Sequence, residues 1–224
     1  MYEAVIFDCD GVLVDTEVLA LDVEGAVLAE FGVVPERSAY MARFMGLDER
    51  SWIAALMEDY PTMAAPGAIE KFLQRAKDGY QAGLEGERLA AIADVHDAVL
   101  AFAGRKAVAS SSNARNLEMK LQRTGLWPRF DPHVYSTELV PKAKPAPDIF
   151  LHAAQALGVE PAQCLVIEDS RNGVLAGRAA GMDVWGFTGG GHCTPESAGP
   201  LTAAGAARVL TSWREAAPLF AAFG

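Results

Sequence analysis

The sequence contains few cysteines and no excess of basic residues. The three cysteines, Cys9, Cys164 and Cys193, are scattered and odd in number, which argues against a disulfide scaffold and a cysteine-based metal site. With 19 lysines and arginines against 29 aspartates and glutamates, the formal net charge is -10. A nucleic-acid partner is therefore not expected. An anionic ligand would need a local metal ion, a lysine or a helix N-terminus.

Long apolar runs are also missing. No stretch approaches the roughly 20 residues that a membrane-spanning helix needs, so no membrane partner is expected. The first residues carry neither the basic segment nor the cleavage site of a signal peptide, which favours a cytoplasmic location. The composition, 51% hydrophobic and 21% charged, is typical of a globular protein. Its 224 residues suffice for one large domain or for a domain with a smaller appendage.

The second half of the chain alternates between short apolar segments and helical patterns. Segments of the strand type occur at 106–110, 133–136, 164–169, 183–187 and 208–210. Such alternation predicts an α/β fold, with a parallel sheet covered by helices on both faces. The run AVIF near the start has the pattern of a strand buried on both faces, and we expect it to join the same sheet.

The stretch from residue 17 to residue 83 has only helical patterns. Its apolar residues recur at helical spacing, as Leu19 and Val23 do, and no convincing strand interrupts them. We therefore expect an all-helical domain at 17–83, inserted into an α/β domain formed by 1–16 and 84–224. The connection at its end is rich in glycine and predicts a hinge. The glycines of this predicted hinge are Gly79, Gly83 and Gly86.

Polar residues stand at the positions where the predicted strands end. Ligands of an open parallel sheet bind beyond the carboxyl ends of its strands, so we expect these residues to form one site. They are Asp8 and Asp10 after the first strand, Ser110, Ser111 and Ser112 at the end of the second, Lys142 and Lys144 after the third, and Glu168 and Asp169 after the fourth. Together they supply hydroxyls, an ammonium group and carboxylates.

Placing Asp8 and Asp10 at the edge of a core costs free energy of folding, because an ionised carboxylate there needs a compensating cation or hydrogen bonds. Positions i and i+2 of an extended chain share one side, so both aspartates can face one ligand. In phosphate monoester chemistry, one carboxylate can attack phosphorus while another protonates the leaving alkoxide. A hard dication such as Mg²⁺ would offset the repulsion between these anions. Lys144 and a serine hydroxyl would stabilise the phosphoryl oxygens.

Four stretches, in this order, resemble the motifs of haloacid dehalogenase superfamily hydrolases. They are DCDGVLVDTE at 8–17, VASSSN at 108–113, KAKPAPDIF at 142–150 and IEDS at 167–170. The resemblance covers essentially the whole chain and is to the subgroup whose helical cap is inserted after the first strand. It implies a Rossmann-like core domain, an inserted cap and a phosphatase active on a small phosphorylated substrate.

The resemblance also implies roles for single residues. Asp8 takes the place of the nucleophile and Asp10 that of the acid/base. Mg²⁺ is implied on Asp8, on the backbone oxygen of Asp10 and on Asp169. Ser110, with its neighbour Ser111, and Lys144 take the phosphate-binding places. Three further candidates would support the site or touch the substrate: Glu168, Gly46 and Asn113. For Glu168 two roles are open, because it either reaches the metal's water shell or orients Lys144.

Within this subgroup the chain is similar to the β-phosphoglucomutases and related sugar-phosphate phosphatases. The mutases carry a hinge histidine where this chain has Ala20, and a phosphate-binding arginine where it has Glu49. An acidic Glu49 would repel a second phosphate, although Arg50 stands beside it. Hydrolysis of a sugar phosphate or a phosphorylated sugar acid is therefore favoured, with a phosphomutase as the alternative.

Two further alternatives remain. A dehalogenase would lack the second acidic residue, so Asp10 argues against it. A catalytically silent binding protein would be expected to have lost a motif residue, and none is missing. Cys9 is interpreted as an inert buried thiol and the stretch 189–193 as a flexible loop. A monomer or a weak dimer is expected.

Overall fold

The structure of the chain is a computed structural model that describes residues 2–44, 47, 49–86 and 89–223. The chain divides into two compact units, Met1–Glu17 with Leu89–Gly224, and Val18–Arg88. Among the described residues, no helix is both long enough and apolar enough to cross a membrane.

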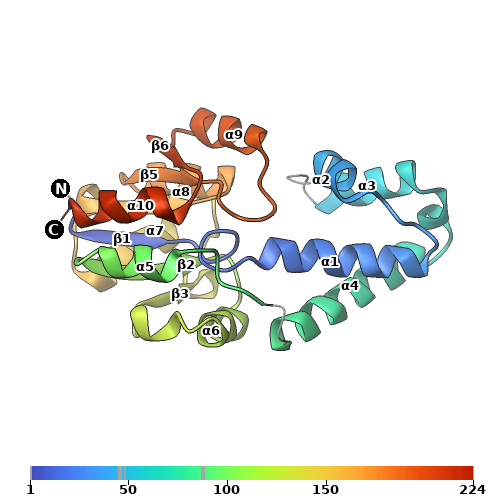
Figure 1. Cartoon of the computed structure of the whole chain (residues 1–224), viewed down its shortest axis with the longest axis horizontal. Coiled ribbons are helices and arrows are strands. Elements are labelled where there is room, and N and C mark those ends of the chain that lie inside the picture. Colours follow the sequence, from blue (N-terminus) through green and yellow to red (C-terminus); the bar gives the residue numbers. More distant parts are fainter. Residues whose placement is uncertain (1, 45–46, 48, 87–88, 224) are drawn as a thin grey trace. The chain divides into compact units, whose positions relative to one another are not determined.

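The first unit is built on a six-stranded sheet with the order β3-β2-β1-β4-β5-β6, in which all neighbours are parallel. Figure 1 shows β1 inside this sheet. All four side chains of β1 are buried, which is why the segment is apolar throughout. The strands are β1 (Ala4–Phe7), β2 (Arg105–Ser110), β3 (Val134–Ser136), β4 (Cys164–Glu168), β5 (Asp183–Phe187) and β6 (Arg208–Leu210).

The register of the central strands positions the site. Phe7, the last residue of β1, lies opposite Val108 of β2 and Ile167 of β4. The three strands therefore reach their carboxyl ends at nearly the same level, and the residues that follow them are brought together at one edge of the sheet.

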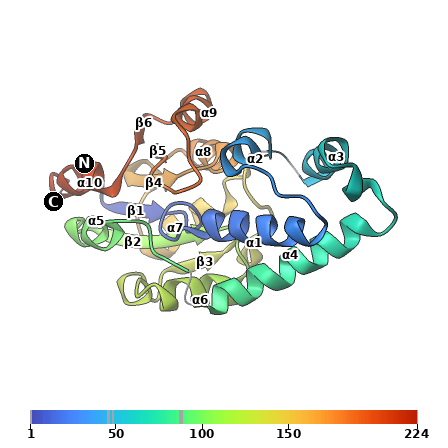
Figure 2. The ribbon, with the colours of Figure 1, turned by 45° about the vertical axis from the view of Figure 1, so that its right-hand side comes forward.

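Helices cover both faces of the sheet, as the sequence predicts. On one face, Ala4 and Ile6 lie in the same buried cluster as residues of α7, α8 and α9. On the other face, Phe7 contacts the rings of Trp213 and Phe220 from α10, which lies beside α5 (Figure 2). These helices are α5 (Val95–Ala101), α6 (Ala114–Arg123), α7 (Asp148–Leu157), α8 (Arg171–Ala179), α9 (Ala198–Ala203) and α10 (Trp213–Ala221). Short 3₁₀ turns, η2 (Trp127–Arg129), η3 (Thr137–Leu139), η4 (Pro161–Gln163) and η5 (Pro195–Ser197), connect them.

The regular structure in the described residues of the second unit is helical. Leu28, Leu56, Met63 and Phe72 are fully buried and form the centre of its own core. Its helices are α1 (Thr16–Glu30, which begins in the first unit), α2 (Arg37–Phe44), α3 (Glu49–Asp59) and α4 (Ala68–Glu85), with the 3₁₀ turn η1 (Pro61–Ala64).

The glycines predicted to form a hinge have a different role. Gly79 and Gly83 lie inside α4, one turn apart. A Cβ at Gly79 would lie 2.8 Å from Cγ1 of Val23, and a Cβ at Gly83 would lie 2.5 Å from Cδ1 of Leu19. The two glycines therefore allow α4 to pack closely against α1. The interpretation of Gly79 and Gly83 as hinge residues is wrong, whereas Gly86 follows the end of α4.

Candidate active site

The loop that follows β1 turns sharply instead of continuing as a strand. The amides of Leu13 and Val14 both donate to the carbonyl of Cys9, at 2.9 and 3.0 Å. Gly11 adopts a φ of +69°, in the left-handed region that favours glycine. The chain therefore leaves the extended conformation at Cys9, between Asp8 and Asp10.

Gly11 also permits a close approach of Asp169. A Cβ on Gly11 would lie 1.9 Å from Oδ2 of Asp169, which follows β4. Only a residue without a side chain allows this carboxylate to lie against the turn. The turn thus brings Asp169 next to the segment that carries Asp8 and Asp10.

Asp8, Lys144 and Glu168 form a buried ion-paired group at this edge of the sheet. Lys144 Nζ donates to Asp8 Oδ1 at 2.5 Å, to Glu168 Oε1 at 2.6 Å and to the carbonyl of Ala109 at 3.0 Å. The side chains of Lys144, Asp8 and Glu168 are 5%, 9% and 1% exposed. Burial raises the pKa of Asp8 well above its ordinary value; Lys144 opposes this shift, and Glu168 and Asp169 add to it. The protein alone therefore compensates the charge of Asp8 only in part.

Asp10 lies in a second group of hydrogen bonds. Its Oδ1 accepts from Lys120 Nζ at 2.5 Å and from Thr16 Oγ1 at 2.6 Å. Its Oδ2 accepts from Ser112 Oγ at 2.7 Å and, at 3.4 Å, from Ser110 Oγ. Burial alone would raise the pKa of Asp10, but Lys120 and the hydroxyl donors more than offset it, so that the pKa is lowered. Both carboxylate oxygens of Asp10 are thus fixed by hydrogen-bond donors from the surrounding side chains.

Glu168 is held in place by the start of α8. Its Oε2 accepts from both the amide and the hydroxyl of Ser170, each at 2.9 Å. Gly173, in the first turn of α8, leaves room for this carboxylate, since a Cβ there would lie 1.8 Å from Glu168 Cδ. The orientation of Lys144 by Glu168, one of the two roles implied by the sequence, matches these contacts.

This close approach predicts the effect of Gly173→Ala. The added methyl must displace Glu168, so we expect the free energy of unfolding to fall by about 1–3 kcal/mol, as overpacking typically does. Gly199→Ala in α9 is the matched control, because no atom lies within 4 Å of a Cβ at that glycine. Urea unfolding of both variants measures the difference. A Gly173→Ala protein as stable as the Gly199→Ala control would contradict the described packing.

The stretch 189–193, interpreted from the sequence as a flexible loop, also contributes to the site. The imidazole Nε2 of His192 lies 3.4 Å from Asp169 Oδ2, and its side chain is only 11% exposed. Gly11 and Gly190 flank the ring, because a Cβ on either would lie 2.8 Å from it. The amide of Gly191 donates to Asp15 at 3.3 Å and ties the stretch to the turn after β1. Sequence reasoning missed His192, although it follows the carboxyl end of a predicted strand.

The other predicted site residues are not all brought into this centre. Ser110 is fully buried, and its Oγ accepts from the amide of Ser112 at 3.1 Å. Ser111 is exposed. Asn113 caps α6, with its side chain accepting from the amide of Asn116 at 2.8 Å. Gly46 lies outside the described residues.

The residues present fit a magnesium ion. Within residues 2–44, 49–86 and 89–223, no three side chains of His, Cys, Asp or Glu cluster as metal ligands. Magnesium does not need such a cluster, since it is usually bound by one or two carboxylates, water and the substrate phosphate. Burial and like charges raise the pKa of Asp8, and burial raises that of Asp169 to about 6 although His192 opposes the shift, so a bound cation would stabilise the ionised form of both carboxylates. Asp8, Asp169 and the carbonyl of Asp10 are the oxygens that would hold the ion.

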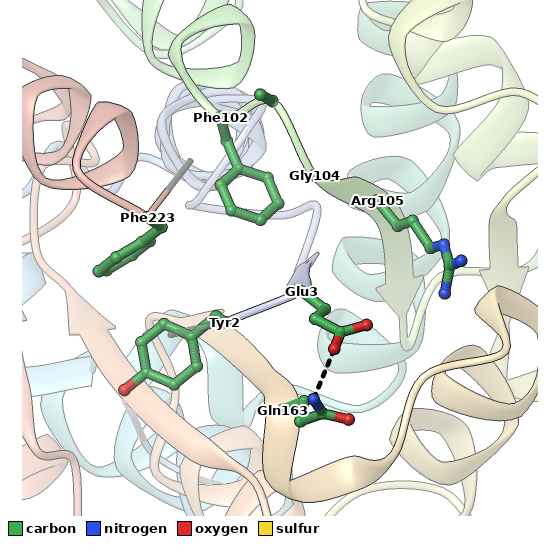
Figure 3. Close-up of a pocket in the computed structure, with 8 residues that line it drawn as sticks. Tyr2, Glu3, Phe102, Gly104, Arg105, Gln163 and Phe223 are labelled. Atoms are coloured by element: carbon green, nitrogen blue, oxygen red, sulfur yellow. Dashed lines mark hydrogen bonds between the residues drawn. The ribbon is translucent and has the colours of Figure 1, made fainter.

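A pocket at the opposite edge of the sheet does not contain this chemistry. Figure 3 shows it at the amino ends of the strands, with Glu3 accepting a hydrogen bond from Gln163 at 2.6 Å. Its lining is Tyr2, Glu3, Phe102, Ala103, Gly104, Arg105, Gln163 and Phe223. None of the predicted site residues that the structure describes lines it.

Comparison with known proteins defines the class of this protein. The haloacid dehalogenase-like hydrolase family matches residues 2–181. The chain therefore belongs to the haloacid dehalogenase-like hydrolases, as its four motifs predict.

Several curated relatives are named as phosphatases. The chain is 33% identical to the phosphorylated carbohydrates phosphatase of Thermotoga maritima, over 81% of this chain and 82% of that protein. It is 32% identical to the fructose-1-phosphate phosphatase YqaB of Escherichia coli, over 81% of this chain and 94% of the relative. A haloacid dehalogenase family hydrolase from Deinococcus radiodurans, solved with bound phosphate and sodium, is 35% identical with a TM-score of 0.84, covering 96% of this chain and 93% of that one. The predictions of an α/β fold and of a phosphatase of this family are confirmed.

Proposed function

We propose that this protein is a Mg²⁺-dependent phosphatase that hydrolyses a small phosphorylated metabolite through a covalent intermediate on Asp8. The observation that carries the proposal is the buried group in which Lys144 Nζ contacts Asp8 Oδ1 at 2.5 Å and Glu168 Oε1 at 2.6 Å. Lys144 pairs with two carboxylates there, compensates their charge only in part and can also stabilise charge on phosphoryl oxygens. The phosphorylated carbohydrates and fructose 1-phosphate named for two relatives support a sugar phosphate or a phosphorylated sugar acid as substrate.

The first half-reaction transfers the phosphoryl group to Asp8. A carboxylate oxygen of Asp8 attacks phosphorus, the bond from phosphorus to the ester oxygen breaks, and the leaving oxygen takes the proton of Asp10, which enters this step in its protonated form. When bound, Mg²⁺ would offset the repulsion between Asp8 and the phosphate. Lys144 and Ser110 would contact the phosphoryl oxygens.

The second half-reaction restores the enzyme. Asp10 accepts a proton from water, the resulting hydroxide oxygen attacks phosphorus, and the bond from phosphorus to Asp8 breaks. Inorganic phosphate leaves, and Asp8 is a carboxylate again. Asp10 thus gives a proton in the first step and recovers one in the second. We place this reaction in the cytoplasm, catalysed by a monomer or a weak dimer.

A panel of substrates tests the proposal directly. Purified protein with Mg²⁺ is offered phosphorylated sugars, sugar acids and nucleotides, and the release of inorganic phosphate is measured. We expect release from at least one sugar phosphate or phosphorylated sugar acid, and little from nucleotides. A protein that releases phosphate only from nucleotides would contradict the proposed substrate class.

The proposal also predicts hydrolysis rather than isomerisation of β-glucose 1-phosphate. A mutase must grip the distal phosphate of a bisphosphate, and this chain has Ala20 and Glu49 in place of the mutase histidine and arginine. Supplied with glucose 1,6-bisphosphate, the protein should therefore release inorganic phosphate and form little glucose 6-phosphate. Efficient isomerisation with negligible phosphate release would contradict this result and would assign the distal phosphate to Arg50.

A further inference from the structure

Lys120 is a buried lysine to which the predicted motifs assign no role. It lies in α6 between Leu117 and Leu121, which are buried on the same face of the helix. Its side chain is only 2% exposed, and lysines are almost never buried this completely unless they are paired. Its ammonium group is directed at Asp10, with Nζ 2.5 Å from Oδ1.

Lys120 and Ser112 hold both oxygens of Asp10. Nζ donates to Asp10 Oδ1 at 2.5 Å and to Ser112 Oγ at 2.8 Å. Ser112 Oγ in turn donates to Asp10 Oδ2 at 2.7 Å. The three groups therefore close a ring of hydrogen bonds, which fixes both the position and the rotation of the Asp10 carboxylate from the side of α6.

This ring is separate from the group around Asp8. The cation beside Asp8 is Lys144, which follows β3, whereas the cation beside Asp10 comes from α6. Thr16 Oγ1 supports Asp10 from the start of α1 at 2.6 Å, but it carries no charge. Each of the two aspartates thus has its own buried lysine.

We propose that Lys120 is a positioning residue for the acid/base Asp10, holding its carboxylate where a proton can pass to the leaving oxygen and from water. This inference rests on the proposed function, in which Asp10 performs both transfers. Proton transfer requires a donor within hydrogen-bond reach, and a misplacement of about 1 Å can lower a rate about 10²-fold. Lys120 itself contacts neither the phosphate nor Asp8 in this account.

Two esters of similar size separate positioning of Asp10 from a structural role. Benzyl phosphate leaves as an alkoxide that needs a proton, whereas p-nitrophenyl phosphate leaves as a stable phenolate. With Mg²⁺ present, we expect Lys120→Met to lower kcat/KM about 10²-fold for benzyl phosphate and less than about 3-fold for p-nitrophenyl phosphate. Lys77→Met, at an exposed lysine of α4, is the control and should change neither value.

The double variant Asp10→Asn/Lys120→Met provides a second readout. If Lys120 acts through Asp10, the double variant should have the same kcat/KM for benzyl phosphate as Asp10→Asn alone. The double variant can also be compared with Asp10→Asn if Lys120→Met alone does not fold. It lacks both the ammonium group of Lys120 and the carboxylate of Asp10, so neither buried charge is left without its partner. Equal losses for the two esters, a further loss in the double variant, or a double variant that does not fold would overturn the inference.

The activity of the wild-type protein on the two esters tests the proposed function, whereas the losses in Lys120→Met test the role of Lys120. Wild-type protein that hydrolyses both esters, together with an equal loss for both in Lys120→Met, would overturn the role of Lys120 and leave the phosphatase proposal standing. Wild-type protein that releases phosphate neither from these esters nor from any member of the substrate panel would overturn the phosphatase proposal, and the inference with it.

Discussion

Asp8→Asn is expected to abolish nearly all phosphate release, with kcat lowered by about 10⁴-fold or more, as in other enzymes that lose a nucleophile. The amide has nearly the same shape but cannot attack phosphorus as a carboxylate does. The fold should survive, because Glu168 still pairs with Lys144 at 2.6 Å. The free energy of unfolding should not fall, since the change removes a carboxylate whose pKa is raised by burial and by nearby carboxylates.

Phosphate release and urea unfolding of Asp8→Asn measure the two expectations separately. Asp97→Asn, at an exposed aspartate in the first turn of α5, is the matched control and should keep full activity. An Asp8→Asn protein that folds normally and retains more than about a tenth of the wild-type kcat would contradict the assignment of Asp8 as nucleophile.

Removal of divalent metal should produce the second large effect. Asp8 and Asp169 are both nearly buried, with side chains 9% and 11% exposed, and Asp8 shares its only ion-pair partner, Lys144, with Glu168 in the described residues. Without Mg²⁺, an anionic substrate would have to approach these carboxylates against their repulsion. Chelation with EDTA should therefore lower phosphate release at least about 10²-fold, and added Mg²⁺ should restore it.

The control for this experiment is protein dialysed in parallel without the chelator. Elemental analysis of the treated sample shows whether metal has been removed. Full activity in a sample shown to be free of divalent metal would contradict the proposed role of Asp8 and Asp169.

The strands at the centre of the α/β core can be predicted from the sequence, because the apolar pattern of a buried strand lies within the strand itself. A strand buried on both faces must be apolar throughout, and β1 and β4 are so from end to end. A short segment is harder to recognise, and α5, with seven residues, was not predicted. The candidate residues that follow β1 and β4 come together because the register aligns the carboxyl ends of these strands.

Lys120 and His192 could not be placed in the site from sequence alone. A lysine in an amphipathic helix normally faces solvent, and only the buried leucines beside Lys120 hint that its position faces inward. His192 follows three glycines, which are typical of an irregular loop. Its position beside Asp169 depends on contacts with Gly11, about 180 residues earlier in the chain.

The glycines show the same limit of sequence reasoning. Gly79 and Gly83 suggest flexibility when read alone, yet both serve the packing of α4 against α1. Gly11 and Gly173 look like ordinary turn and helix residues, but the space they leave is filled by Asp169 and Glu168. What a glycine contributes is decided by the neighbour that occupies this space, which a single sequence does not reveal.

Chemical trapping of the covalent intermediate tests the central claim most directly. Wild-type protein is mixed with Mg²⁺ and p-nitrophenyl phosphate, quenched with borohydride during turnover, digested and analysed by mass spectrometry. Borohydride reduces an aspartyl-phosphate to homoserine, so we expect homoserine at position 8, only when substrate is present and never in Asp8→Asn. An unmodified Asp8 in protein quenched during turnover, or substrate-dependent reduction at Asp10 instead, would contradict the account.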